Sequence, residues 1–328
     1  MHQPTKNITA FSAALAIAAF TAPAATLAQE AAWPTRPIKI IVTFVPGGGA
    51  DILGRYIAQG LTSALGQPVV VENKAGAGGL IGVDAGLAAP ADGYTLTLIS
   101  SSYTVNPSLY KLKFDPVHDI TPIAQISAGP LLVVTHPSSD LKTMKDIERA
   151  ARKAPGTVTY ASSGKGSALH LAAAEFANRT RVEMNHIPYK GGGAALNDVL
   201  GKQVDVYFAA TASALPHVAG GKLRAVAVTT PKRLSALPDV PTIQESGYPG
   251  YDVTLWYGLI GPKGMPTAVV QRINQEINKI LALPATPKKF QTHGAEPAGG
   301  TPEAFRQLIG QEIKTWGDIV GKLDIKPH

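Results

Sequence analysis

A strand, a glycine turn and a helix start follow each other closely near the beginning of the chain, and this succession constrains the fold most. Residues Ile38–Val45 form a β-branched run without Gly or Pro, typical of a buried strand in a parallel sheet. Pro46 ends the run, Gly47–Gly49 allow a tight turn, and an amphipathic helix begins near Ala50 or Asp51. The free N–H groups of such a helix start suit an anion. A turn capped by Asp51, without any ligand, is the alternative.

The same succession recurs later in the chain. Val158–Ala161 leads into Ser162–Ser167 and a helix, and Val182–Pro188 leads into a third glycine turn and another helix. The alternation of strands and helices predicts an α/β fold with parallel strands. Another predicted strand, Leu96–Ile99, runs into Ser100–Thr104 at the strand edge where ligands of open α/β sheets bind. A plain connecting loop is the alternative for this serine-rich stretch.

The length of 328 residues predicts two lobes. Gly129-Pro130, between strands Ile123–Ile126 and Leu131–Thr135, marks one crossing between them, and the strand Leu255–Ile260 marks the other. We therefore predict a first lobe of residues 33–128 and 253–328 and a second lobe of residues 129–252.

Residues 1–28 have the pattern of a signal peptide. Lys6 supplies a positive start, Ile8–Phe20 is apolar, and Ala28 is the expected cleavage site. A retained N-terminal anchor is the alternative. The mature protein is therefore predicted to leave the cytoplasm, and the absence of cysteine excludes disulfides and thiolate chemistry.

Several classes of function are disfavoured. The net charge of +7 is scattered and forms no basic stripe, so we expect no nucleic-acid partner, although the field favours an acidic ligand. No spacing of His, Asp or Glu indicates a metal, and we expect no cofactor. Ser163, Ser167 and His170 are close enough for a hydrolase, but there is no G-x-S-x-G turn and Ser167 fits a helix cap better.

Two further features leave alternatives open. Lys165 stands near a helix N-terminus, where a cation is disfavoured by about 0.3–1 kcal/mol, so it is either a solvated lysine or a partner for an anion. The stretch Asn73–Gly82 has the glycines of a dinucleotide fingerprint at the wrong spacing and without the acidic residue.

Ordered motifs along nearly the whole mature chain resemble the substrate-binding proteins of tripartite tricarboxylate transporters, the TctC-like or Bug receptors. The matching stretches include WPTRPIKIIVTFVPGGGADILGR, GQPVVVENKAGAGGLIGVD, ASSGKGSALHLAAAEF, IPYKGGGAALNDVLGKQVDVYF, LPDVPTIQESGYPGYD and WYGLIGPKGMP. The resemblance implies a periplasmic-binding-protein type II-like fold, with two α/β lobes joined by crossover strands around a ligand cleft. It also implies a non-enzymatic receptor, which we expect to be a monomer, that delivers a small organic acid to membrane permease subunits. A sensing receptor and, less favoured, a secreted hydrolase are the alternatives.

In the family, the loops corresponding to Pro46–Asp51 and Ser162–Ser167 hold one ligand carboxylate, and Gly76–Gly82 becomes a structural turn. Ala209 replaces an aspartate common in relatives, which argues against an amino-acid ligand. Tyr103 either stacks on an aromatic acid or packs in the wall. With Lys165 as a second anchor, we favour a dicarboxylate or an aromatic carboxylate. The predicted ligand-binding residues are Pro46, Gly47, Gly48, Gly49, Ala50, Asp51, Ser100, Ser101, Ser102, Tyr103, Ser162, Ser163, Gly164, Lys165, Gly166, Ser167, His170, Gly191, Gly192, Ala209 and Thr211.

Overall fold

The computed structural model describes residues 1–2, 33–291 and 294–322. Apart from Met1 and His2, the predicted signal peptide lies outside the described residues. Contacts divide the chain between Trp33 and Pro34, and every helix and strand that the structure describes belongs to the second unit.

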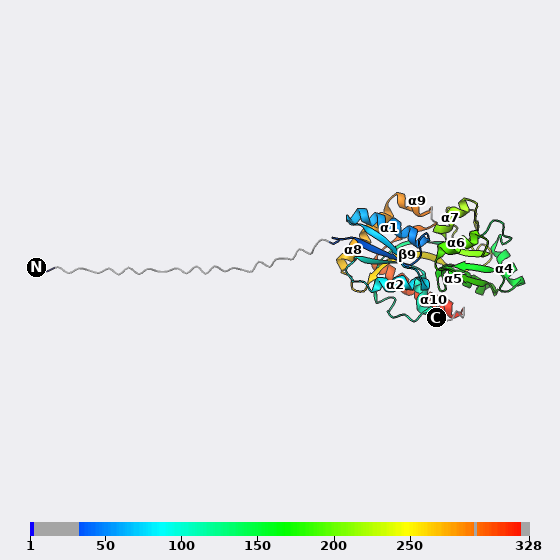
Figure 1. Ribbon diagram of the computed structural model, residues 1–328, viewed down its shortest axis with the longest axis horizontal. Coiled ribbons are helices and arrows are strands. Elements are labelled where there is room, and N and C mark those ends of the chain that lie inside the picture. Colours follow the sequence, from blue (N-terminus) through cyan, green and yellow to red (C-terminus); the bar gives the residue numbers. More distant parts are fainter. Residues whose placement is uncertain (3–32, 292–293, 323–328) are drawn as a thin grey trace. The chain divides into compact units, whose positions relative to one another are not determined.

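One group of elements forms the first lobe, built on three parallel strands with β1 in the middle. Figure 1 shows α1, α2 and α8 around these strands. The elements of the first lobe are β1 (Ile38–Val42), α1 (Gly49–Leu65), β2 (Val69–Asn73), the 3-10 turn η1 (Ala77–Gly79), α2 (Leu80–Leu87), β3 (Thr95–Ser100), α3 (Ser102–Leu109), α8 (Thr267–Ala282), α9 (Ala285–Gln291), β10 (Glu296–Gly299) and α10 (Pro302–Lys322).

The second lobe repeats this plan, with β5 between β6 and β7 in parallel pairing. Helices α4 to α7 surround it on the other side of Figure 1. Its elements are α4 (Met144–Lys153), β5 (Thr159–Ser162), α5 (Ala168–Thr180), β6 (Asn185–Pro188), α6 (Gly192–Leu200), β7 (Val206–Ala210), α7 (Thr211–Ala219) and β8 (Arg224–Val228).

Two antiparallel strands, β4 (Ile120–Thr135) and β9 (Thr254–Pro262), join the lobes. The first part of β4 pairs with β9 and β10, and its last part, Leu131–Thr135, pairs with β7 and β8. The separate strands predicted around Gly129-Pro130 are therefore wrong, because both residues pair with β9 inside one continuous strand. The predicted two-lobed α/β fold with crossing strands is confirmed, while its exact lobe boundaries stay a prediction.

Helix α1 shows how the local pattern positions the turn before it. Leu53, Ile57 and Leu61 lie at helical spacing and are buried against the sheet. Gly66 ends the helix in the left-handed conformation and donates its N–H to the Thr62 carbonyl. The helix axis is thus fixed at both ends, and its N-terminus stays at the carboxyl edge of β1.

The predicted loop after the third strand is wrong. Ser102, Tyr103 and Thr104 form the first turn of α3, and the buried side chains of α3 pack against α10. Thr104 Oγ1 donates to Glu312 of α10 at 3.0 Å, and Tyr103 belongs to a core cluster with Trp256. Tertiary burial, not local pattern, makes this segment helical.

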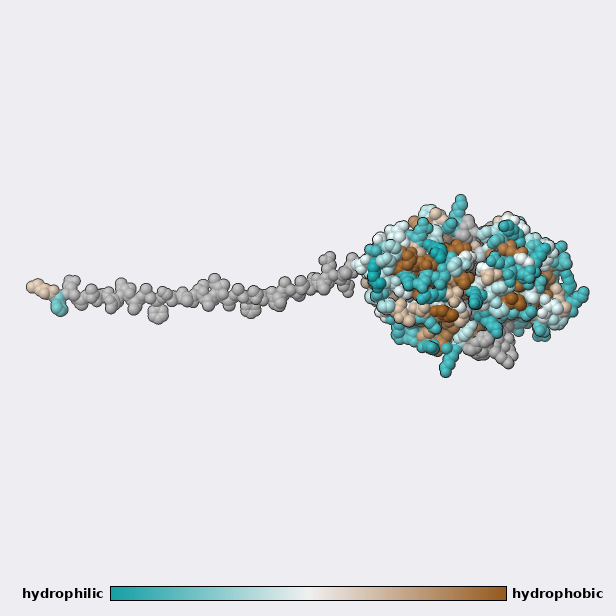
Figure 2. Space-filling model, viewed as in Figure 1, coloured by the Kyte–Doolittle hydropathy of each residue, from teal (hydrophilic) through white to brown (hydrophobic). Residues whose placement is uncertain are grey.

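Polar residues cover most of the face in Figure 2, with apolar residues in small separate patches.

Candidate functional site

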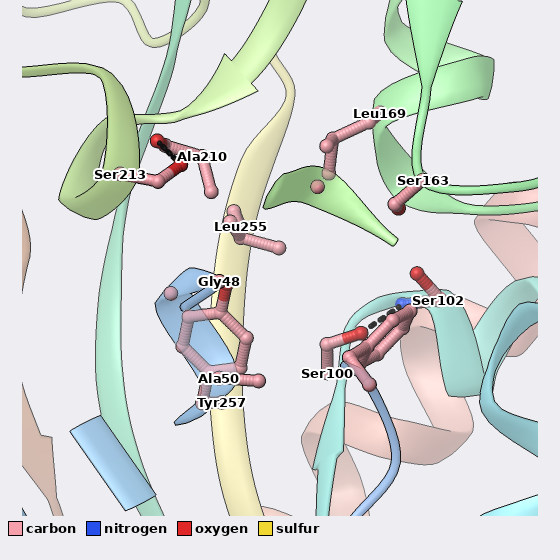
Figure 3. A pocket seen from close by; sticks show the side chains of 13 residues that line it. Gly48, Ala50, Ser100, Ser102, Ser163, Leu169, Ala210, Ser213, Leu255 and Tyr257 are labelled. Carbon is pink, nitrogen blue, oxygen red and sulfur yellow. Dashed lines mark hydrogen bonds between the residues drawn. The ribbon is translucent and has the colours of Figure 1, made fainter. Parts of the chain in front are cut away.

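Five helices begin around one cavity at the carboxyl edges of the strands. Helices α1 and α3 belong to the first lobe, and α5, α6 and α7 belong to the second. Figure 3 shows side chains from both lobes and from β9 surrounding this space. We call it the inner cavity, and its lining consists of Phe44, Gly48, Gly49, Ala50, Ser100, Ser102, Ser163, Leu169, Gly192, Ala210, Ser213, Leu255 and Tyr257.

Among the residues that the structure describes, no charged side chain lines the inner cavity. Four of the five helices, α1, α3, α6 and α7, begin without a hydrogen bond from an N-cap side chain. Helix N-termini carry unsatisfied N–H groups and a partial positive charge, so they can supply both to a carboxylate. The positive potential of this cavity thus comes from backbone rather than from a lysine or arginine.

The inner cavity has a volume of about 30 Å³. That space holds about two water molecules. A carboxylate, with its two oxygens, is a group of about this size.

Asp51 stabilises the turn from within rather than facing the cavity. Its carboxylate accepts hydrogen bonds from Gly47 N–H at 3.1 Å and from Asn73 Nδ2 at 2.9 Å, and it forms an ion pair with Arg55. Burial raises the pKa of Asp51, but the hydrogen bonds from Arg55, Asn73 and Gly47 outweigh burial and leave this pKa below its usual value. Asp51 therefore fixes the backbone of the glycine turn as an anion.

Two stacked histidines support the loop Ser162–Ser167 of the second lobe. The rings of His170 and His186 are 4.0 Å apart and nearly parallel. His170 Nδ1 accepts from Gly166 N–H at 3.1 Å, and Ser162 Oγ lies 2.7 Å from His186 Nε2. Because His170 Nδ1 accepts this bond, that nitrogen carries no proton.

Both histidines are held neutral. Burial, followed by the charges of His186 and Lys165, lowers the pKa of His170 to about 3. Burial and the charge of Lys165 lower the pKa of His186 to about 4. The loop therefore keeps its hydrogen bonds throughout the neutral range.

The two lobes touch each other beside the inner cavity. Ser102 Oγ accepts a hydrogen bond from Ala168 N–H, the first residue of α5, at 3.0 Å. A Cβ atom added to Gly191 would lie only 2.2 Å from Val45 Cγ2. This contact explains why residue 191 is glycine, since any residue can adopt its φ of 162°.

A second space, which we call the outer cavity, lies next to the inner one and shares Phe44 and Ser163 with it. Its volume is about 230 Å³. It is bounded on one side by the first lobe and on the other by two loops of the second lobe, and its lining consists of Phe44, Gly76, Ala77, Gly78, Gly79, Tyr110, Ser163, Gly164, Lys165, Tyr189 and Lys190.

The structure brings nine of the predicted site residues to these two cavities. The inner cavity takes Gly48, Gly49, Ala50, Ser100, Ser102 and Gly192, the outer takes Gly164 and Lys165, and Ser163 lines both. Thr211 lines a smaller space beside Gly129 and donates to the Pro130 carbonyl at 2.6 Å. The predicted residues that line none of these three spaces are Pro46, Gly47, Asp51, Ser101, Tyr103, Ser162, Gly166, Ser167, His170, Gly191 and Ala209.

Three of these residues have clear structural contacts. Tyr103 is 2% exposed, stacks on Phe114 and donates to the Pro116 carbonyl, so it packs in the wall. Ser167 accepts from His170 N–H as the N-cap of α5, which confirms the predicted cap. Ala209 is fully buried in β7.

Sequence reasoning missed several lining residues of the inner cavity. Tyr257 and Leu255 come from β9, the crossing strand, which is buried at every position after Thr254, so its sequence does not mark the residues that face the cavity. Strand β3 pairs Ser100 with Tyr257, and this nonlocal register brings the ring to the cavity. The other missed residues are Phe44, Leu169, Ala210 and Ser213.

Comparison with known proteins identifies the family. Residues 53–325 match the model of the tripartite tricarboxylate transporter family receptor, TctC. The chain belongs to this family. The predicted resemblance to TctC-like Bug receptors is thereby confirmed, and the protein is a solute-binding receptor.

Similar proteins cover almost the whole chain. Protein BugT of Bordetella pertussis is 37% identical over 323 residues, which are 98% of this chain and 99% of BugT. The structure of R. palustris Rpa4515 with adipate has a TM-score of 0.87 and 32% identity, covering 90% of this chain and all of that one. MatC from Rhodopseudomonas palustris with bound malate has a TM-score of 0.82 and 28% identity, covering 88% of this chain and all of MatC.

Proposed function

We propose that this receptor binds a small organic acid in the periplasm and delivers it to the membrane permease subunits of a tripartite tricarboxylate-type transporter. The observation that carries the proposal is the set of five helix N-termini around an inner cavity without charged side chains. Such a site binds a carboxylate through backbone N–H groups and hydroxyls. Lobe closure then removes the bound group from water and forms the surface that the permease recognises.

Two similar proteins support an acid as the ligand, since one was solved with adipate and the other with malate. Lys165 at the outer cavity favours a ligand with a second negative charge, and the rings of Phe44 and Tyr189 in the same lining favour an aromatic acid. The described linings of the two cavities supply no carboxylate for an ammonium group, so an amino acid is disfavoured. The ligand class that we propose is therefore a dicarboxylate or an aromatic carboxylate.

We propose no catalytic role. The Ser162–His186 pair has the separation of a nucleophile and a base, but Ser162 is fully buried and lines neither cavity. The Ser167 hydroxyl accepts from the His170 backbone amide as a helix cap. Neither serine is placed to attack a bound ester.

The test is a thermal-shift screen of the protein from residue 29 onward against aliphatic dicarboxylates, tricarboxylates, aromatic acids and amino acids. A ligand at 100 times its Kd stabilises the folded state by about 2.7 kcal/mol, and a chain of this size gains roughly 2–4 °C per kcal/mol. We expect Tm to rise by several degrees with one or a few acids. Unfolding removes any ligand carried through purification, and the protein is then refolded in the presence and in the absence of each acid. No shift with any carboxylate after refolding would refute the proposal.

A further inference from the structure

The sizes of the two cavities divide the ligand into two parts. The inner cavity of about 30 Å³ accommodates a carboxylate, whereas the outer cavity of about 230 Å³ is several times larger. Phe44 and Ser163 belong to both linings, so the two spaces are neighbours. The space beside Gly129 also adjoins the inner cavity but has a volume of only about 10 Å³. The outer cavity is therefore the larger of the two neighbouring spaces for the remainder of an acid whose carboxylate fills the inner cavity.

The described lining of the outer cavity includes two cations and no acidic residue. Lys165 and Lys190 are both exposed. Among the described residues, neither ammonium group takes part in an ion pair or a side-chain hydrogen bond. Two unpaired cations at one cavity attract a second anion.

The walls of the outer cavity come from both lobes. Residues Gly76–Gly79 form one wall, with positive φ at all four, including 137° at Gly76 and 99° at Gly79. Tyr189 forms part of the opposite wall, and its hydroxyl is held by Asp198 at 2.6 Å. Tyr110 links the walls by donating to the Lys165 carbonyl at 3.4 Å. Positive φ and close packing explain the glycines of this wall, since an added Cβ would meet Ile81 at Gly76 and Thr43 at Gly79.

We infer that the outer cavity is a second subsite, in which Lys165 and Lys190 bind the remote carboxylate of an elongated dicarboxylic acid. This inference rests on the proposed function, because the first carboxylate must occupy the inner cavity. The aromatic rings of Phe44 and Tyr189 contact the spacer between the two acid groups. A longer spacer separates the two acid groups further, so we expect adipate, with four methylene groups, or an aromatic diacid to reach both cavities more readily than succinate, with two.

The experiment measures Kd by calorimetry for matched pairs: hexanoate with adipate, benzoate with terephthalate, and butyrate with succinate. We expect the first two diacids to bind at least about tenfold more tightly than their monoacids, the gain of one charge-assisted hydrogen bond. The double variant Lys165→Gln/Lys190→Gln should reduce this preference to less than about threefold, because it weakens diacid binding much more than monoacid binding. High salt should narrow the preference of the wild type in the same way, because both lysines are exposed.

Lys153→Gln is the matched control, because Lys153 is exposed in the last turn of α4 and lines neither cavity. Equal affinity of the wild type for monoacids and diacids would overturn the inference and leave the proposed function standing. A diacid preference that survives in the double variant would overturn it as well. Failure of the wild type to bind any carboxylate would instead refute the proposed function. Equal Tm values for the ligand-free proteins show that the variants are folded.

Discussion

Replacing Gly191 by alanine should weaken ligand binding without weakening the fold. An added Cβ would lie 2.2 Å from Val45 Cγ2 and 3.3 Å from Val45 Cβ, whereas carbon atoms prefer about 3.5–4.0 Å. The backbone at Gly191 is extended, with φ 162° and ψ 167°, so alanine causes no strain of its own. The whole cost therefore falls on the contact between the two lobes.

Overpacking of this kind costs about 1–3 kcal/mol. If the cost applies only when the lobes are closed on a ligand, Kd rises roughly 5- to 140-fold. The ligand-free protein should keep its Tm within about 2 °C, because the added Cβ strains only the contact between the lobes and leaves the core of each lobe unchanged. Calorimetry with the strongest acid from the screen and thermal unfolding measure the two quantities.

The second-site variant Val45→Ala removes both methyl groups nearest to the added Cβ. The double variant Gly191→Ala/Val45→Ala should therefore recover most of the lost affinity, which a double-mutant cycle expresses as a coupling energy. Gly310→Ala is the control, because an added Cβ there meets no atom within 4 Å. An unchanged Kd for Gly191→Ala, or no recovery in the double variant, would refute the reasoning. A large fall in ligand-free Tm would show that the contact belongs to folding rather than to closure.

Two more predictions follow from the loops around the cavity. Gly48→Val should raise Kd more than about tenfold, because Gly48 lines the inner cavity. Tm should change little, because the backbone of Gly48 is in an ordinary extended conformation. An unchanged Kd would show that this turn is not part of the site. The contribution of His170 and His186 to the free energy of unfolding should be constant above pH 6.5 and should fall below it. In the unfolded state a histidine binds a proton near pH 6.5, whereas folded His170 and His186 bind one only near pH 3 and pH 4. Between pH 6.5 and 5 the loss from His170 is on the order of 2 kcal/mol. Urea unfolding measures it, and His170→Asn should flatten the slope because an amide oxygen can still accept from Gly166; an identical slope would contradict the argument.

The spacing of apolar residues along the sequence predicted most of the repeated strand–turn–helix units. The β-branched run at Ile38–Val45, the glycine turn after it and the apolar stripe of α1 are each visible within about 20 residues. The family motifs added the two-lobed arrangement. Local signals suffice here because a buried parallel strand and an amphipathic helix each impose their own pattern on the chain.

Other features depend on partners far away in the sequence. Gly129-Pro130 has the composition of a turn, yet pairing with β9 keeps β4 continuous, and Pro130 uses its carbonyl to accept from Thr211. Ser102–Leu109 contains Pro107 and little helical periodicity, but packing against α10 makes it a helix. These outcomes are invisible to a local pattern.

The sequence by itself determined the strand–turn–helix units, the glycines at their turns and the family to which the chain belongs. Only the tertiary structure decided that five helix N-termini meet at one small cavity and that Lys165 and Lys190 border a larger one beside it. The reason is physical: a helix start is encoded by neighbouring residues, whereas the volume of a cavity depends on side chains such as Tyr257, which nonlocal strand pairing brings to it.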